Sequence, residues 1–285
     1  MSSLALALVL VAAIAHATWN LLVKRVAGDA AFLWLFEALG VMIYAPLAVA
    51  IIILRHPVVD GPTILFMAGS GFLHLVYFVL LQRGYRTGDL SFVYPLARGT
   101  GPVLATAAAI LFLGERPAPL ALGGAVLVAT GVFVIAGGRR AGNAATGGVV
   151  AYALLTGAMI AAYTLWDKYA VSTLLVPPAL LYWGSSLVLT TSLAPVAIVN
   201  WAAVRRYWRD HRREALGIAI LSPLSYVLVL TALVFTPVSY IAPAREISIL
   251  IGAAMGSRLL AEGQTARRLA AATGMLIGLI ALAVS

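Results

Sequence analysis

The stretch SFVYPLAR, which runs from Ser91 to Arg98, recurs in the second half of the sequence as SYIAPAR, from Ser239 to Arg245. In each copy a proline comes shortly before the arginine, and a glutamate follows the arginine after 17 residues, as Glu115 and as Glu262. Self-similarity at a fixed separation is typical of an internal duplication. The sequence therefore predicts two related halves, offset by about 147 positions.

Other positions match at nearly the same offset. Trp34 aligns with Trp183, and TWNLLVK, which ends at Lys24, aligns with YTLWDK, which ends at Lys168. We expect residues 1–140 to form the first repeat and residues 141–285 to form the second. A duplication kept only for stability would also explain these matches.

The composition is that of a membrane protein. Of the 285 residues 62% are hydrophobic and only 10% are charged, and the mean hydropathy is +1.01. A typical soluble protein is about 45–50% apolar and about 25% charged. We therefore expect an all-α integral membrane protein whose first partner is the lipid bilayer.

Several kinds of chemistry are excluded or disfavoured. The chain has no cysteine, and its four histidines, His16, His56, His74 and His211, lie far apart without the spacing of metal ligands. We expect neither a metal site nor a cofactor. The net charge of +9 comes mostly from short connections between apolar segments, so it indicates membrane topology and no nucleic acid partner.

Ten segments are long and apolar enough to be membrane spans, which need about 20 residues each. They cover residues 3–23, 30–54, 62–82, 90–113, 118–137, 147–170, 175–201, 214–236, 238–260 and 268–284. The odd-numbered connections hold 14 Lys and Arg residues, and the even-numbered ones hold only Arg55, Arg116 and Lys168. The positive-inside rule then places the basic connections in the cytoplasm and both termini in the periplasm.

The number of spans decides how the halves are related. Each half has five spans, and because five is odd the second half crosses the membrane in the opposite sense. The expected fold is ten transmembrane helices arranged as two inverted five-helix repeats. Inverted repeats are typical of transporters, which hold their substrate between the halves near the middle of the membrane.

Four charged residues fall deep inside predicted spans. Arg98 and Arg245 lie deep in the fourth and ninth spans, and Glu37 and Glu246 are the only acids that we place at comparable depth. A central arginine costs at least about 2.5 kcal/mol on insertion scales, so it needs a partner or a wet cavity. Two interpretations stay open: structural ion pairs, or an arginine that receives a substrate carboxylate.

Two prolines lie near these arginines. Pro95 and Pro243 are each the sixth residue of their predicted span, where a proline leaves the carbonyl four residues earlier without its helical hydrogen bond. Those carbonyls would be available to a substrate ammonium group. If the helices begin two or three residues later, both prolines fall in the first turn and break nothing.

Aromatic and polar side chains share faces of several spans at helical spacing, which predicts a wall suited to a flat, partly apolar solute. The candidate substrate-binding residues are His16, Trp19, Asn20, His74, Tyr77, Phe78, Tyr94, Arg98, Tyr163, Trp166, Ser222, Tyr226, Ser239 and Tyr240. The candidate structural or gating residues are Glu37, Pro95, Pro243, Arg245 and Glu246. Trp166 could instead be an interfacial anchor, and His74 either a proton-coupling group or a hydrogen-bonded wall residue.

Two longer motifs carry a resemblance to a known family. HATWNLLVKR, which begins at His16, and GYRTGDLSFVYPLARGTGPVLATAAAILFLGERP, which begins at Gly84, resemble the ten-helix EamA-type carriers of the drug/metabolite transporter superfamily. The resemblance covers the whole chain more weakly and extends to exporters of aromatic amino acids. It implies a bacterial inner-membrane carrier that exports aromatic or other neutral hydrophobic amino acids by alternating access.

Other functions are weaker expectations. A carrier of another metabolite, such as an organic acid, a phosphorylated compound or a lipid-linked sugar, is the main alternative. We do not expect an enzyme, because the sequence contains neither HExxH nor GxSxG. A passive channel would need a continuous polar stripe, whereas the polar residues here gather at intermediate depth. The sequence leaves the oligomeric state open.

Overall fold

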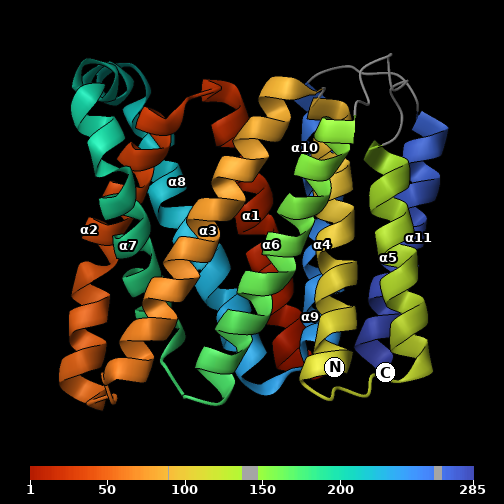
Figure 1. The fold of residues 1–285 in the computed structure, drawn as a ribbon. Coiled ribbons are helices and arrows are strands. Elements are labelled where there is room, and N and C mark those ends of the chain that lie inside the picture. The colour runs from red at the N-terminus through yellow and green to blue at the C-terminus, as the bar shows by residue number, and fades with distance from the viewer. Residues whose placement is uncertain (89, 137–146, 260–264) are drawn as a thin grey trace.

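The computed structural model describes residues 1–88, 90–136, 147–259 and 265–285, with backbone only for 90–92, 94, 95, 135, 136, 253, 256–259 and 265–269. Within this part of the chain every regular element is a helix (Figure 1). The helices are α1 (Ser3–Val26), α2 (Ala30–Arg55), α3 (Gly61–Thr87), α4 (Leu90–Phe112), α5 (Pro119–Ala136), α6 (Gly147–Ser172), α7 (Pro178–Val199), α8 (Trp201–Phe235), α9 (Val238–Arg245), α10 (Ile247–Leu259) and α11 (Thr265–Val284).

Six of these helices, α1, α2, α3, α6, α7 and α8, are long and apolar enough to cross a membrane. Local sequence explains where three of them begin. Ser2, Asp29 and Asp60 each accept a hydrogen bond from a backbone N–H of the following first turn, so they cap α1, α2 and α3. A capping oxygen satisfies one of the N–H groups that a helix start leaves without a partner.

Two of the predicted spans differ from the helices of the structure. The stretch between the predicted spans 175–201 and 214–236 is helical, because α8 begins at Trp201 and continues through a distortion at His211. This polar segment contains good helix formers such as Arg and Ala. The segment 238–260, expected as one span, is divided at Glu246 into α9 and α10.

The helices pair across the two halves of the sequence (Figure 1). Helix α1 packs against α8, α3 against α6, α2 against α7, and α5 against α11. The last pair meets through glycines: a Cβ added to Gly124 would lie 2.6 Å from the Gly278 carbonyl oxygen, and the reverse distance is also 2.6 Å. Small residues allow such close approach of helices in membranes.

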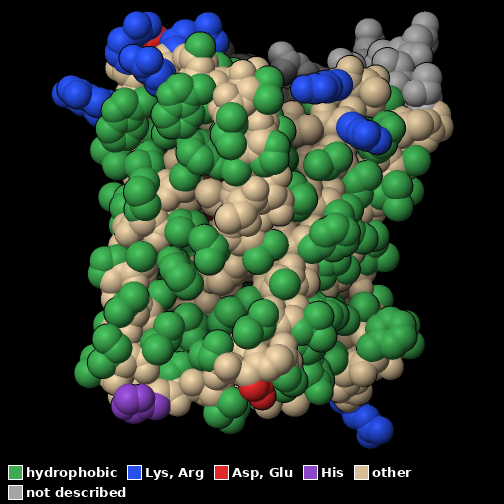
Figure 2. All heavy atoms as spheres, turned by 60° about the vertical axis from the view of Figure 1, so that its left-hand side comes forward, with side chains coloured by type: hydrophobic (Ala, Val, Ile, Leu, Met, Phe, Trp, Pro, Cys, Tyr) green, Lys and Arg blue, Asp and Glu red, His purple; other side chains and the backbone are tan. Residues whose placement is uncertain are grey.

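The two ends of the bundle differ in charge. At one end, here called the basic end, lie Lys24, Arg25, Arg83, Arg86 and the arginines at the start of α8, above a broad apolar belt (Figure 2). Both chain termini lie at the opposite end, called the terminal end, where the N-terminal amine donates to the Ala283 carbonyl (Figure 1). The structure thus places the termini opposite the charged connections.

Candidate functional site

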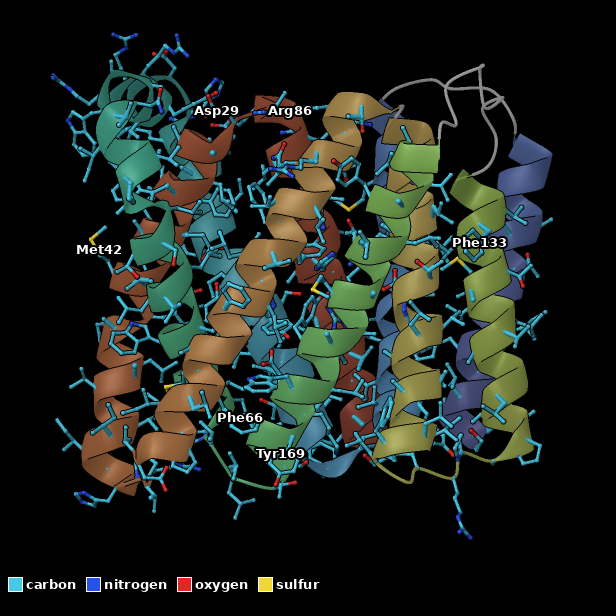
Figure 3. The ribbon with its side chains drawn as sticks, viewed as in Figure 1. Asp29, Met42, Phe66, Arg86, Phe133 and Tyr169 are labelled. Carbon is cyan, nitrogen blue, oxygen red and sulfur yellow. The ribbon has the colours of Figure 1, made fainter. Side chains whose placement is uncertain are left out.

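A central cavity of about 290 Å³ lies between the helices of the two halves. Its walls come from α1, α2, α3, α4, α6, α7, α8 and α9. The cavity reaches the basic end at Gly28, Asp29 and Tyr85, and Figure 3 places Asp29 at that end. No described lining residue belongs to the connections at the terminal end. The cavity is therefore accessible from the basic end.

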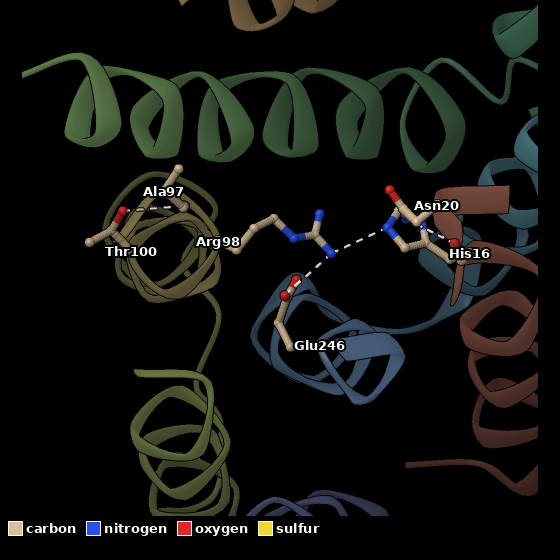
Figure 4. A network of polar contacts seen from close by, with 6 residues as sticks. All are labelled: His16, Asn20, Ala97, Arg98, Thr100 and Glu246. Carbon is tan, nitrogen blue, oxygen red and sulfur yellow. Dashed lines mark hydrogen bonds and ion pairs between the residues drawn. The ribbon is translucent and has the colours of Figure 1, made fainter. Parts of the chain in front are cut away.

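The first polar group of the cavity, called the arginine cluster, consists of Arg98, Glu246 and His16. Arg98 Nη2 lies 3.3 Å from Glu246 Oε2 and 3.4 Å from His16 Nε2 (Figure 4). The side chains of Arg98 and Glu246 are only 8% and 4% exposed. A buried charge is tolerated when it is paired and hydrogen-bonded. This ion pair joins α4 to the point where α9 meets α10.

A proline precedes the break between α9 and α10, and Glu246 lies in that break. Pro243 is the sixth residue of α9, and Pro95 is the sixth residue of α4, so the predicted positions of both prolines are confirmed. The alternative in which the prolines lie in a first turn is wrong. Helix α9 ends two residues after Pro243, at Arg245, and Glu246 follows in the break. A proline inside a helix disrupts the local hydrogen bonding that would continue it.

The second polar group, called the carboxyl cluster, consists of Asp167, Tyr226, His74 and Ser70. The Tyr226 hydroxyl donates to Asp167 Oδ2 at 2.6 Å, and His74 Nδ1 lies 2.8 Å from the Ser70 carbonyl oxygen. Arg245 lies over the Tyr226 ring at 5.6 Å, within the range of a cation–π contact. Tyr226 therefore contacts both an arginine of the cavity and the buried carboxyl group of Asp167.

Aromatic rings form one wall of the cavity. His74 stacks on Tyr163 with ring centroids 4.2 Å apart, and Tyr77 meets Tyr163 edge to face at 5.9 Å. On the opposite side Trp19 contacts His16 edge to face at 4.9 Å. Rings with polar tips at this density give a surface that suits a flat solute with a few polar groups.

A third acid lines the cavity near α7. Glu37 Oε2 accepts a hydrogen bond of 3.0 Å from the Ser186 hydroxyl. Within the part of the chain that the structure describes, no Lys, Arg or His nitrogen lies within 4.0 Å of the Glu37 carboxyl group. Glu37 lines the cavity, so a cationic group of a ligand can reach this acid.

The terminal end of the cavity is closed by packed rings and by a helix cap. Phe66 stacks on Trp166 at 4.3 Å and on Tyr169 at 5.3 Å, and Trp166 Nε1 donates to the Phe66 carbonyl (Figure 3). Lys168 donates to the carbonyls of Leu233 and Thr236 at the end of α8. These contacts tie α3, α6 and α8 together below the cavity.

Glu115 binds the start of α9 at the terminal end. Its two carboxylate oxygens accept hydrogen bonds from the backbone N–H groups of Val238 and Ser239, at 2.7 and 2.9 Å. A carboxylate at a helix start satisfies N–H groups that lack helical partners and complements the helix dipole. The first glutamate of the repeated motif therefore caps α9, whereas the second, Glu262, lies outside the described residues.

Most of the predicted site residues meet in the central cavity. Those that line it are His16, Trp19, Asn20, Glu37, His74, Tyr77, Phe78, Arg98, Tyr163, Ser222, Tyr226 and Arg245. Pro243 and Glu246 border a second, apolar hollow of about 560 Å³ between α4 and α5, which also touches Arg98. The side chains of Tyr94 and Pro95 lie outside the described residues.

Three predicted residues lie at the terminal end and not on the cavity wall. Trp166 belongs to the closing stack. Ser239 is held by Glu115, and the Tyr240 hydroxyl accepts a hydrogen bond from the Ala118 N–H at 3.3 Å. These residues lie near an end of α6 or of α9, so they are outside the cavity. The spacing of residues along a helix predicts which face of the helix they share, but it does not predict how far along the helix the cavity extends.

Sequence reasoning missed several cavity residues. Tyr182, Ser185, Ser186, Ser225 and Gln82 line the cavity. Asp167, which shares a helix face with Tyr163, is fully buried beside the cavity. The signal available for the missed residues was the adjacent pair Ser185 and Ser186 inside an apolar span.

The chain resembles known proteins in its fold and in the sequence of its first half. A solved structure titled "Crystal structure of protein" is similar with a TM-score of 0.75 at 16% identity, over 100% of this chain and 98% of its own. At this identity the likeness shows a shared fold alone, and 29 solved chains match in total. No curated protein matches the sequence significantly.

Residues 3–137 match the model of the EamA-like transporter family. Six of the described helices are also long and apolar enough to cross a bilayer. Together these findings support a multi-pass membrane protein whose first half is an EamA-like domain.

Proposed function

We propose that the protein carries a small metabolite across the membrane by alternating access, and that it exports aromatic or other neutral hydrophobic amino acids. The EamA-like domain suggests a small-molecule transporter. One observation carries the finer proposal: the central cavity combines an aromatic wall with Arg245 on one side and Glu37 on another. A carboxylate can bind to the arginine, an ammonium group to the glutamate, and an apolar side chain to the rings.

The charge balance of the cavity supports an anionic group in the substrate. Arg98 is paired with Glu246, whereas Arg245 contacts the ring of Tyr226 and lies more than 4.0 Å from any described carboxylate oxygen. Arginine binds carboxylates through two parallel hydrogen bonds. Arg245 is therefore the residue that we assign to the substrate carboxylate, and Arg98 holds α4 against Glu246.

An arrangement as two inverted repeats, with five helices in each half, is also part of the proposal. Its best support is a reciprocal pair of hydrogen bonds between α2 and α7: Trp34 Nε1 donates to the Thr190 carbonyl at 3.1 Å, and Trp183 Nε1 donates to the Val41 carbonyl at 3.0 Å. Donors and acceptors are both offset by 149 positions. The pairing of α1 with α8 and of α3 with α6 has the same symmetry.

Alternating access then has a simple structural basis. The cavity is accessible at the basic end and closed at the terminal end by Phe66, Trp166 and Tyr169. If the halves are related by a two-fold axis in the membrane plane, exchanging their conformations closes the first end and opens the second. We propose that the basic end faces the cytoplasm and that both termini face the periplasm of a bacterial inner membrane.

A C-terminal alkaline phosphatase fusion tests this orientation. Phosphatase is active only outside the cytoplasm, so the fusion will be active in cells. An inactive phosphatase together with a bright C-terminal fluorescent fusion would reverse the orientation.

One observation favours the alternative of a different metabolite. The apolar hollow between α4 and α5 borders the paired Arg98 and Glu246 and is lined by Val103 and Val126, which are exposed to the surroundings of the bundle. Such a hollow would suit the chain of a lipid-linked sugar better than a free amino acid. An organic acid or a phosphorylated compound would bind in the central cavity through Arg245.

Uptake into proteoliposomes tests the proposal. Purified protein is reconstituted and supplied with labelled phenylalanine, with excess unlabelled phenylalanine, tryptophan, threonine, succinate or a sugar phosphate as competitor. We expect saturable flux that the aromatic amino acids inhibit most strongly. Inhibition by succinate or the sugar phosphate alone, or no phenylalanine flux from folded protein, would reject the amino acid substrate and leave the fold unchanged.

A further inference from the structure

Asp167 lies fully buried in α6, between the central cavity and the closing stack at the terminal end. Its Oδ2 accepts the 2.6 Å hydrogen bond from Tyr226, while Oδ1 has no well-formed hydrogen bond although the Ser70 hydroxyl lies close. Within the described ranges no Lys, Arg or His nitrogen lies within 4.0 Å of this carboxyl group. A buried carboxyl group without an ion pair is tolerated far better when it holds a proton.

We propose that the Asp167 carboxyl group, hydrogen-bonded to Tyr226 at the floor of the cavity, is the site that binds and releases a coupling proton. This inference rests on the proposed transport function and supplies its energy source. Asp167 does not itself line the cavity, so the proton moves between its carboxyl group and water of the cavity by way of the Tyr226 hydroxyl, and no bond of the substrate changes. The titratable or charged groups around Asp167 are His74 from α3, Tyr226 from α8, Arg245 from α9 and Tyr163 from α6 itself, and Arg98 of α4 and Tyr182 of α7 line the same cavity.

Tyr226 links the proton site to the proposed substrate site. Its hydroxyl contacts Asp167, and its ring lies under Arg245. A zwitterionic substrate whose carboxylate is bound to Arg245 and whose ammonium group faces Glu37 also lies within the electric field of Asp167. The ionised carboxyl group attracts that ammonium group, and protonation removes the attraction. Proton and substrate therefore compete, as exchange of a proton for an exported amino acid requires.

Infrared spectroscopy tests the proton site without any substrate. Difference spectra of the purified protein between about pH 5 and about pH 9, a range over which buried carboxyl groups titrate, will contain a carbonyl band of a protonated carboxyl group. The contribution of Asp167 to this band will be lost in Asp167→Asn, while that of Glu37 remains. The band will be unchanged in the matched control Asp210→Asn, which changes an exposed aspartate paired with Arg209 at the basic end. A wild-type spectrum that Asp167→Asn does not alter would overturn the proposal.

Flux measurements test the coupling. With the liposome interior one pH unit more acidic than the exterior, exchange of one proton per phenylalanine allows up to about tenfold accumulation. Asp167→Asn will lose this accumulation, and the control Asp210→Asn will keep it. Accumulation that Asp167→Asn retains, or that requires a sodium gradient, would overturn the proposal.

The two measurements also separate this inference from the proposed substrate. If folded wild-type protein transports no labelled phenylalanine but shows the infrared band that depends on Asp167, the amino acid proposal fails and the proton site stands. If phenylalanine is transported and the band is absent, the carrier stands and the proton site fails.

Discussion

The arginine cluster and the carboxyl cluster lie on two sides of the same cavity and balance their charges in different ways. Arg98 and Glu246 form an ion pair of 3.3 Å that is almost fully buried. Asp167 has a tyrosine hydroxyl at 2.6 Å and, among the described residues, no ion pair. The first arrangement keeps both groups charged, and the second allows its carboxyl group to gain and lose a proton.

Buried carboxyl groups can therefore have different roles in one membrane protein, depending on whether the partner is an arginine, as for Glu246, or a tyrosine, as for Asp167. An ion pair between α4 and the break at Glu246 stabilises one packing of the helices. Asp167 contacts Tyr226, whose ring lies under Arg245, so its carboxyl group is placed to respond to the substrate that we propose for this cavity. Variants of the two clusters and of the cavity walls test this contrast between a structural ion pair and a titratable carboxyl group, and Arg98→Ala has the largest expected effect.

Arg98→Ala should be the most damaging change, because it leaves Glu246 buried without its cation. Loss of one partner of a buried ion pair costs about 3–5 kcal/mol. We expect flux below detection and a lower unfolding temperature in detergent, measured by the fluorescence of the native tryptophans.

The double variant with Arg98→Ala and Glu246→Ala is the control. It will recover most of the unfolding temperature, because no lone charge remains. Wild-type flux and stability in Arg98→Ala would mean that the pair has no structural role.

Trp166→Ala should open the terminal end. The change removes a stacked ring and the hydrogen bond to the Phe66 carbonyl, contacts worth about 1–2 kcal/mol together. The chain has no native cysteine, so Ser222→Cys in the cavity can be labelled with an impermeant maleimide. We expect labelling from the basic end alone in the single variant and about tenfold faster labelling from the terminal end after Trp166→Ala.

Equal labelling of Ser222→Cys from both ends would show that the ring stack does not close the cavity. Tyr169→Phe serves as a matched control, since it keeps the stacked ring and removes only a hydroxyl group.

Tyr77→Ala and Trp19→Ala should change the order in which amino acids compete. Both side chains line the cavity, whereas Trp208 lies at the basic end outside it. An aromatic contact is worth about 0.5–1.5 kcal/mol, which is about two- to tenfold in an inhibition constant. Competition by phenylalanine against threonine measures the effect, and an equal change in Trp208→Ala would remove support for an aromatic substrate wall.

Tyr226→Phe should have the smallest effect on stability. It removes the hydroxyl that donates to Asp167 and keeps the ring under Arg245. Side-chain hydrogen bonds between membrane helices average about 0.6 kcal/mol and reach about 1.7 kcal/mol. We expect a decrease of that size in the free energy of unfolding and a weaker response of flux to pH. A large loss of stability would show that the carboxyl cluster is structural, like the arginine cluster.

Sequence patterns predicted much of the fold, because a membrane span needs a long apolar segment and the basic residues lie in the connections between spans. The positions of Pro95 and Pro243 within their helices were confirmed. The polar start of α8 was missed, since a helix that leaves the membrane has no apolar run. The division at Glu246 was missed because its flanking segments are apolar on both sides.

The candidate site was predicted in part. Residues in the middle of long spans, such as His16, His74 and Tyr226, meet in the cavity as expected. Trp166 and Tyr240 share the chemistry of those residues but lie near helix ends, so they belong to the closed end. Depth along a helix depends on where the neighbouring helices cross, and one sequence does not give that.

By itself the sequence determined that this is a multi-span helical membrane protein, that its polar residues are concentrated in a few spans, and that its basic connections share one side. Hydropathy, helix period and charge act locally, so they can be recognised without coordinates. Only the tertiary structure decided which acid accompanies which base. Residues separated by more than a hundred positions, Arg98 with Glu246 and Phe66 with Trp166, are brought together by helix crossings. Those crossings depend on the packing of all the helices at once, and this is why the ion pair, the closed end and the buried Asp167 became visible only in the folded chain.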